Sequence, residues 1–125
     1  NADSVCMLVE YDAEGDGTCE ASALLTGDAE APQIEGLIDR GLVGDIDVLK
    51  VGHHGSRAGT TEELCRELKP EYALISVGAR NRYGHPTREA LEALASIGCE
   101  VWRTDEDGDV SCRFTRDGIE ASGMR

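Results

Sequence analysis

Apolar residues along the chain follow two spacings, and these predict an alternation of strands and helices. Apolar runs that are continuous, or that alternate with polar residues, are typical of strands. Apolar residues spaced three and four apart are typical of helices that bury one face. The expected strands span 4–11, 20–26, 47–51, 72–77, 100–103, 109–115 and 119–122, and the expected helices span 30–40, 60–68 and a segment starting at Pro86. This order predicts an α/β fold with a βαβ arrangement and hairpins at both ends.

Particular residues mark where helices and turns should fall. Thr60 and Glu63 have the spacing of a capping box, which predicts a helix start at Thr60. Gly41 and Pro70 follow expected helices and are typical of helix ends. The acidic stretch 105–108 predicts a β-turn that joins strands 100–103 and 109–115 as a hairpin. It does not fit a calcium loop, because its glycine directly follows the second Asp and Arg116 stands where the last Glu would be.

Length and charge narrow the class of protein. The chain has 125 residues, which predicts a single domain over 1–125, and its formal net charge is -13. It contains no run of 18 apolar residues, so we expect no membrane contact by this chain itself. The acidity argues against binding a nucleic-acid duplex by electrostatics alone. Residues 49–90 are the exception, with seven basic and five acidic side chains and all three histidines. This window is either an ordinary mixed surface or one that tolerates a phosphate-sized anion.

The five cysteines include no C-x-x-C pair, which argues against a zinc ribbon. Cys99 and Cys112 flank the expected hairpin, so they either pair across it as a disulfide or remain thiols. We expect Cys6, Cys19 and Cys65 to be small core residues.

Three motifs place chemically useful side chains just after expected strands. Asp28, in Leu-Leu-Thr-Gly-Asp, can bind a cation or can cap the next helix. In Gly-His-His-Gly-Ser, one of His53 and His54 can ligate a metal while the other donates a proton, or both are surface histidines. His85 precedes Pro86 and is either a helix cap or a third imidazole. Because ligands bind beyond the carboxyl ends of parallel strands, we expect these residues and the loop 78–85 to converge on one rim.

These motifs occur in a familiar order over essentially the whole chain. They are Leu24-Leu-Thr-Gly-Asp-Ala-Glu30, Asp47-Val-Leu-Lys-Val-Gly-His-His-Gly-Ser56, Ile75-Ser-Val-Gly, Asn81-x-Tyr-Gly-His-Pro86 and Arg103-Thr-Asp105. Together they resemble the C-terminal metallo-β-lactamase-like domain of ComEC-type DNA-internalisation (competence) proteins. The resemblance implies an αββα sandwich of two similar halves with a dinuclear metal site between them. It also implies that the parent protein is an inner-membrane channel for single-stranded DNA. The domain would lie outside the membrane, on either side of it, and would act as a nuclease.

The resemblance assigns roles by position. Asp28 matches the metal-bridging Asp, and one of His53 and His54 matches a ligand or proton donor. We assign Asp28 and His53 to the metal, which is zinc or manganese, and His54 and His85 to catalysis. The alternatives are another hydrolase of the superfamily, acting on small phosphodiesters or esters, and a non-catalytic module of the channel.

One departure from the family pattern is decisive for these expectations. The H-x-H-x-D-H motif, which the resemblance places in the N-terminal half, is absent from the sequence. The chain therefore resembles the C-terminal half only, a mixed sheet with helices on one face. We expect a partial metal site, little or no activity in isolation, and an apolar sheet face. That face would be covered by the N-terminal half in the parent protein and by a second copy in a homodimer of this chain.

Overall fold

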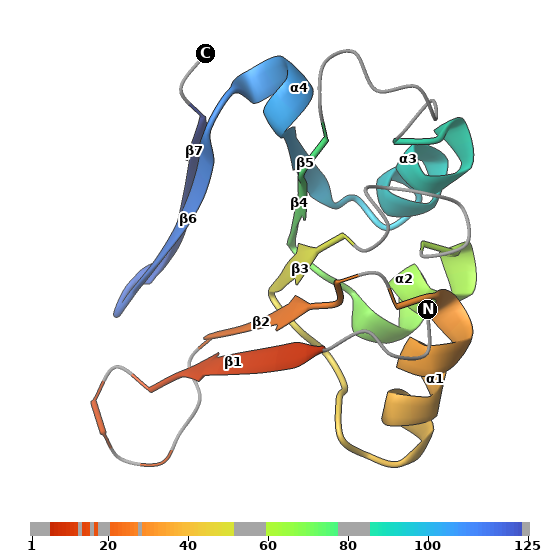
Figure 1. The fold of residues 1–125 in the computed structure, drawn as a ribbon. Helices are drawn as coiled ribbons and strands as arrows, with labels where there is room; N and C mark the ends of the chain where they lie inside the picture. The colour runs from red at the N-terminus through yellow and green to blue at the C-terminus, as the bar shows by residue number, and fades with distance from the viewer. Residues whose placement is uncertain are drawn as a thin grey trace.

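A five-stranded mixed sheet forms the centre of the molecule, in the order β1-β2-β3-β4-β5 (Figure 1). The computed structural model describes residues 6–12, 14–15, 17, 21–27, 29–51, 60–77 and 86–123. The strands of the sheet are β1 (Met7–Tyr11), β2 (Ala21–Leu25), β3 (Val48–Lys50), β4 (Tyr72–Ile75) and β5 (Glu100–Arg103). Strand β1 is antiparallel to β2, whereas β2, β3, β4 and β5 run parallel to one another. The predicted α/β fold with a mixed sheet is therefore confirmed.

Three helices cover one face of this sheet (Figure 1). They are α1 (Ala31–Asp39), α2 (Glu62–Leu68) and α3 (Arg88–Ala95). In-register residues Leu24, Leu49 and Ala73 form the sheet side of the core, and each is at most 3% exposed. Leu68 and Leu94 contribute from the helices and are 0% exposed. Burying apolar side chains of this size stabilises the fold by roughly 1.5–3 kcal/mol each.

The helix starts differ from the sequence prediction in an informative way. The N-cap of α2 is Thr61, whose hydroxyl accepts a hydrogen bond from the Leu64 N–H at 3.1 Å. The prediction of Thr60 was wrong by one residue, because Thr61 is the residue whose extended backbone turns its hydroxyl toward the first helical turn. Helix α3 begins at Arg88 rather than Pro86, with Thr87 as its N-cap. Helix α2 ends at Leu68, before Pro70, as predicted.

The C-terminal part of the chain corrects the predicted hairpin. Strand β5 pairs with β4 in parallel, and the acidic stretch forms the short helix α4 (Thr104–Asp107) rather than a β-turn. Asp107 stabilises this helical turn, because its carboxylate accepts the backbone N–H of Arg103 at 2.8 Å. The hairpin instead joins β6 (Val110–Thr115) to β7 (Gly118–Gly123). The predicted last strand is thereby confirmed.

The four described cysteines, Cys6, Cys65, Cys99 and Cys112, are free thiols. The disulfide alternative for Cys99 and Cys112 is therefore wrong, since Cys112 lies in β6 and pairs with β7 rather than with the strand after Cys99. Burial raises the pKa of Cys99 to about 12 and that of Cys65 to about 11. Neither thiol is a thiolate at neutral pH, which fits the predicted structural role of Cys65.

The β6–β7 hairpin stands on the side of the sheet opposite the helices (Figure 1), and Cys112 and Phe114 of β6 line a pocket of about 270 Å³ together with residues of β2, β3 and β4. The Phe114 ring approaches Tyr11 of β1, with centroids 6.0 Å apart. Near the end of the hairpin, Gly123 passes so close to α4 that a Cβ would lie 2.8 Å from the carbonyl oxygen of Asp107. The hairpin leaves part of this face open: Met7, Val9 and Leu25 are 54%, 41% and 39% exposed. An apolar strip on β1 and β2 therefore faces solvent.

Candidate functional site

The parallel strands that precede the three predicted site segments end at one edge of the sheet. Register pairs Leu25 with Lys50, and Lys50 with Leu74, so β2, β3 and β4 end side by side. We call the residues that follow them, Thr26, Val51 and Val77, the carboxyl edge. Asp28, His53, His54 and His85 lie outside the described residues, within segments that start two, one and one residues beyond these positions. The structure thus describes the frame from which the predicted site residues extend.

Thr26 fixes the position of the backbone where the chain leaves β2. Its side chain is 0% exposed, and its hydroxyl donates to the Lys50 carbonyl at 3.1 Å, which ties the end of β2 to β3. Its own carbonyl accepts the N–H of Ala29 at 3.0 Å. Gly27, between them, has φ +57°, a conformation that glycine adopts without a Cβ penalty. The backbone on both sides of position 28 is therefore held in a tight turn.

The backbone is also fixed by hydrogen bonds where the chain leaves β3 and β4. Val51 is 1% exposed and donates its N–H to the Leu74 carbonyl at 2.9 Å. Thr104 makes two bonds with Val77: its hydroxyl accepts the Val77 N–H at 2.8 Å and donates to the Val77 carbonyl at 2.9 Å. Thr104 is the first residue of α4 and directly follows β5, so its bonds tie the segment after β4 to the end of the neighbouring strand β5. Rigid strand ends of this kind position loop residues for binding and catalysis.

The helix caps remove two of the alternatives that the sequence left open. The N-cap of α1 is Glu30, and its backbone N–H donates to Gln33 Oε1 at 2.9 Å. The N-cap of α3 is Thr87, whose hydroxyl accepts the Ala90 N–H at 3.2 Å. Both cap positions are thus filled by residues other than Asp28 and His85. The prediction that Asp28 or His85 is the N-cap of the next helix is therefore wrong, and the site roles of these two residues stay predictions.

Asp105, which belongs to the last of the quoted motifs, is engaged by a neighbour. The Arg103 guanidinium donates two hydrogen bonds to its carboxylate, at 3.0 and 2.7 Å. These bonds hold the pKa of Asp105 below its usual value. Arg103 also lies 3.3 Å from Glu106. The cluster stabilises α4, and through Thr104 it supports the carboxyl edge.

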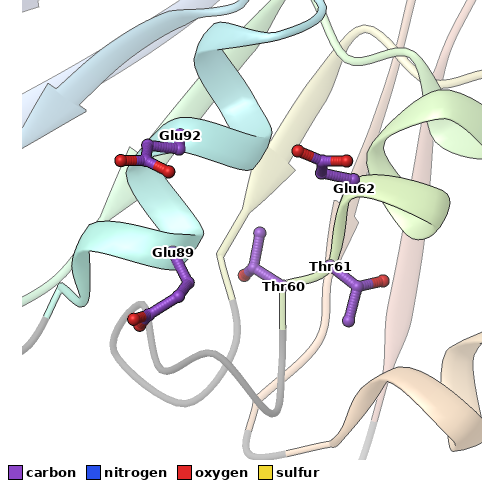
Figure 2. Close-up of a pocket in the computed structure, with 5 residues that line it drawn as sticks. All are labelled: Thr60, Thr61, Glu62, Glu89 and Glu92. Atoms are coloured by element: carbon purple, nitrogen blue, oxygen red, sulfur yellow. The ribbon is translucent and has the colours of Figure 1, made fainter.

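An acidic hollow of about 260 Å³ lies between the starts of α2 and α3. Figure 2 shows Thr60 between the two helices, with Glu62 on one side and Glu89 and Glu92 on the other. Thr61 completes the lining. The two helices follow the strands β3 and β4, so the hollow is next to the carboxyl edge. Sequence reasoning missed Thr60 as a buried polar group, because its spacing to Glu63 suggested a cap.

A second group of acidic side chains lies between α1 and α2. Carboxylate oxygens of Glu35, Glu63 and Glu67 lie within 4.8 Å of one another, and no other such metal-capable group is found in the part of the chain that the structure describes. Partial burial raises the pKa of Glu35, and the negative charges of Glu63, Glu67 and Asp39 add to this effect. Exposed acidic groups occur commonly without a metal, so this group on the helix layer is not assigned a function.

Fold and frame together define an α/β domain whose candidate site lies at the carboxyl ends of parallel strands. No family model matches the sequence. The chain is 41% identical over 93 residues to ComE operon protein 3 of Bacillus subtilis, which covers 74% of this chain and 12% of that protein. It is 39% identical over 125 residues to Recombination protein 2 of Haemophilus influenzae, which covers 100% of this chain and 15% of that protein.

A third relative is Competence protein ComA of Neisseria gonorrhoeae, with 33% identity over 107 residues, 84% of this chain and 15% of that protein. The names of these relatives indicate a competence-protein family, and the chain belongs to this family. The chain spans between 12% and 15% of the length of these three relatives.

Within the described residues, no helix is both long enough and apolar enough to cross a membrane.

Proposed function

We propose that the chain is part of a divalent-metal-dependent phosphodiesterase domain that acts on DNA during natural transformation. One observation carries the proposal: the strand ends that precede Asp28, the His53–His54 pair and His85 in the chain share one edge of the sheet. Relatives with competence names support the biological setting. By the resemblance, the parent protein lies in the inner membrane and this domain lies outside it.

Each candidate residue has a proposed role. Carboxylate oxygen and imidazole nitrogen form a donor set that suits zinc or manganese. Asp28 and one of the adjacent histidines, assigned as His53, would hold the metal. A metal held there would polarise a phosphate and lower the pKa of a bound water. His54 and His85 would position the phosphate and donate a proton to the leaving oxygen.

The chain supplies only part of such a site. Catalytic metal sites take about three protein ligands for each ion, and the sequence has three histidines in all. The remaining ligands would come from the N-terminal half that the resemblance implies. The isolated chain should therefore bind metal weakly and be inactive or nearly so.

The test compares this chain with a longer protein extended N-terminally to include the H-x-H-x-D-H motif. We expect the longer protein to retain about two metal ions per chain after desalting and to cut DNA, whereas this chain does neither. Metal content is measured by plasma emission, and cleavage is followed on labelled single- and double-stranded DNA. Stoichiometric metal and cleavage by this chain alone would refute the half-site proposal. If the longer protein binds metal but cleaves only small phosphodiesters, the alternative hydrolase is supported. If the longer protein neither binds metal nor cleaves any of these substrates, the interpretation as a non-catalytic module is supported.

We further propose that the apolar strip of β1 and β2 is an interface. In the parent protein the N-terminal half would cover it, and in the isolated chain a second copy would. Met7, Val9 and Leu25 share the face that the hairpin leaves open. We expect this chain to sediment as a dimer and Val9→Lys to sediment as a monomer, because a buried lysine at the interface is costly. Glu10→Lys, which alters the next residue of the same strand, is the control. If the unsubstituted 125-residue chain sediments as a monomer, the proposal is contradicted.

A further inference from the structure

The acidic hollow between α2 and α3 contains a buried hydroxyl without a partner. Thr60 is 3% exposed, and within the described residues its Oγ1 is the one buried side-chain oxygen or nitrogen that has no hydrogen-bond partner. An unsatisfied buried polar atom costs about 1–3 kcal/mol. In Figure 2 this oxygen points from the start of α2 toward α3, into the hollow that Glu89 and Glu92 line. The hydroxyl thus has no hydrogen-bond partner within the protein and is directed toward the hollow.

The charge of the hollow selects a cation as that ligand. Glu92 and Glu62 each pair with an arginine of their own helix, at 2.8 Å to Arg88 and 3.7 Å to Arg66. In both pairs one carboxylate oxygen makes the contact, which leaves the other oxygen of each. Among the described residues, no ion pair or hydrogen bond is made by the Glu89 carboxylate. Among the described lining residues, an unpaired negative charge therefore remains at Glu89, and Glu62 and Glu92 each keep one oxygen outside their ion pair.

The spacing of these carboxylates selects a cation that keeps its own shell of donors. Among the residues that the structure describes, the carboxylates whose oxygens lie close enough to share a bare metal ion are those of Glu35, Glu63 and Glu67, which do not line the hollow. Mg²⁺ sheds water reluctantly and often keeps several water ligands when bound. Its waters donate hydrogen bonds, which is what an unpartnered hydroxyl oxygen and separate carboxylates can accept. A volume of about 260 Å³ has room for such a hydrated ion.

We propose that this hollow binds a hydrated Mg²⁺ ion through its water ligands, with Thr60, Glu89 and Glu92 as acceptors. The inference deepens the proposed function, on which its purpose rests. An acidic hollow next to a phosphodiesterase site would repel the phosphates of the substrate. A bound Mg²⁺ ion would reduce that repulsion without taking part in the reaction.

The test uses cobalt(III) hexammine, an inert ion that resembles hydrated Mg²⁺ and can bind only through its outer shell. In the 125-residue chain, titration with either ion should shift the amide NMR signals of 60–63 and 88–92. Binding should be weak, with a dissociation constant on the order of 1 mM for Mg²⁺. Thr60→Val should weaken binding of both ions about fivefold, the equivalent of one hydrogen bond. Glu89→Gln should weaken it further, and Glu120→Gln, on the exposed side of β7, should leave it unchanged.

The unfolding temperature of Thr60→Val distinguishes a hydroxyl that binds a cation from one that stabilises the fold. Without cations, this substitution should raise the unfolding temperature, because it removes a buried polar atom that has no partner. A loss of stability would mean that Thr60 has a structural partner, and unchanged cation binding in Thr60→Val or Glu89→Gln would equally overturn the proposal. The proposed catalytic site is independent of this outcome: Asp28→Ala should abolish zinc or manganese binding by the longer protein and leave cobalt(III) hexammine binding intact.

Discussion

Asp28→Ala should lower the DNA-cleavage rate of the N-terminally extended protein by about 1,000-fold or more. An effect of this size corresponds to roughly 4 kcal/mol of transition-state stabilisation, which is what a lost metal supplies. Metal content should fall together with the rate. The unfolding temperature of the metal-free protein should stay the same, because Glu30 and not Asp28 caps α1. Rates with saturating zinc or manganese, and metal content after desalting, measure both effects.

The matched control is Asp45→Ala, which removes an exposed carboxylate from the segment between α1 and β3. It should leave cleavage and metal content unchanged. His53→Ala and His54→Ala, tested separately, should resolve the roles of the adjacent pair: the ligand variant loses metal, whereas the proton-donor variant keeps metal and loses rate. If Asp28→Ala retains metal and rate, Asp28 is not a ligand and the assignment by resemblance fails.

The regular elements were predictable because their signals are local. The apolar runs of β2, β3 and β4 and the apolar spacing of α1 and α3 each carry their own periodicity, and the structure follows it. The same runs also predicted that the ends of β2, β3 and β4 share one edge, since parallel strands joined by helices must do so. For this reason the shared edge of the described strand ends could be predicted, whereas the convergence of the candidate residues there stays a prediction.

The errors arose where tertiary contacts decide between local alternatives. Strand β5 has no local feature that distinguishes a hairpin partner of β6 from a parallel partner of β4, and pairing with β4 buries Val101 against the core. Likewise, Thr60 and Thr61 are adjacent threonines, and either has the chemistry of a cap. Packing between α2 and α3 buries the first and leaves the second to cap. The hollow lined by Thr60 follows from that packing, so no pattern in the sequence indicated it.

Thr104→Val should destabilise the chain by about 2–3 kcal/mol, because it leaves both the N–H and the carbonyl of Val77 without their partner. Valine has nearly the same shape as threonine, so the change tests the hydroxyl alone. In the longer protein it should also reduce DNA cleavage at a temperature where the protein remains folded. The reason is that Val77 is the last described residue before the segment with His85. Denaturant unfolding and cleavage rates provide the two measurements.

A core variant shows whether a loss of stability alone accounts for the reduced cleavage. Leu68→Ala removes a side chain that is 0% exposed in α2 and should cost about 2–5 kcal/mol. Because Leu68 lies at the end of α2 remote from the carboxyl edge, this variant should keep its cleavage rate while folded. Thr104→Ser retains the hydroxyl and should restore both stability and rate. Equal rates in Thr104→Val and Leu68→Ala would show that the contact between α4 and β4 supports the fold without positioning the site.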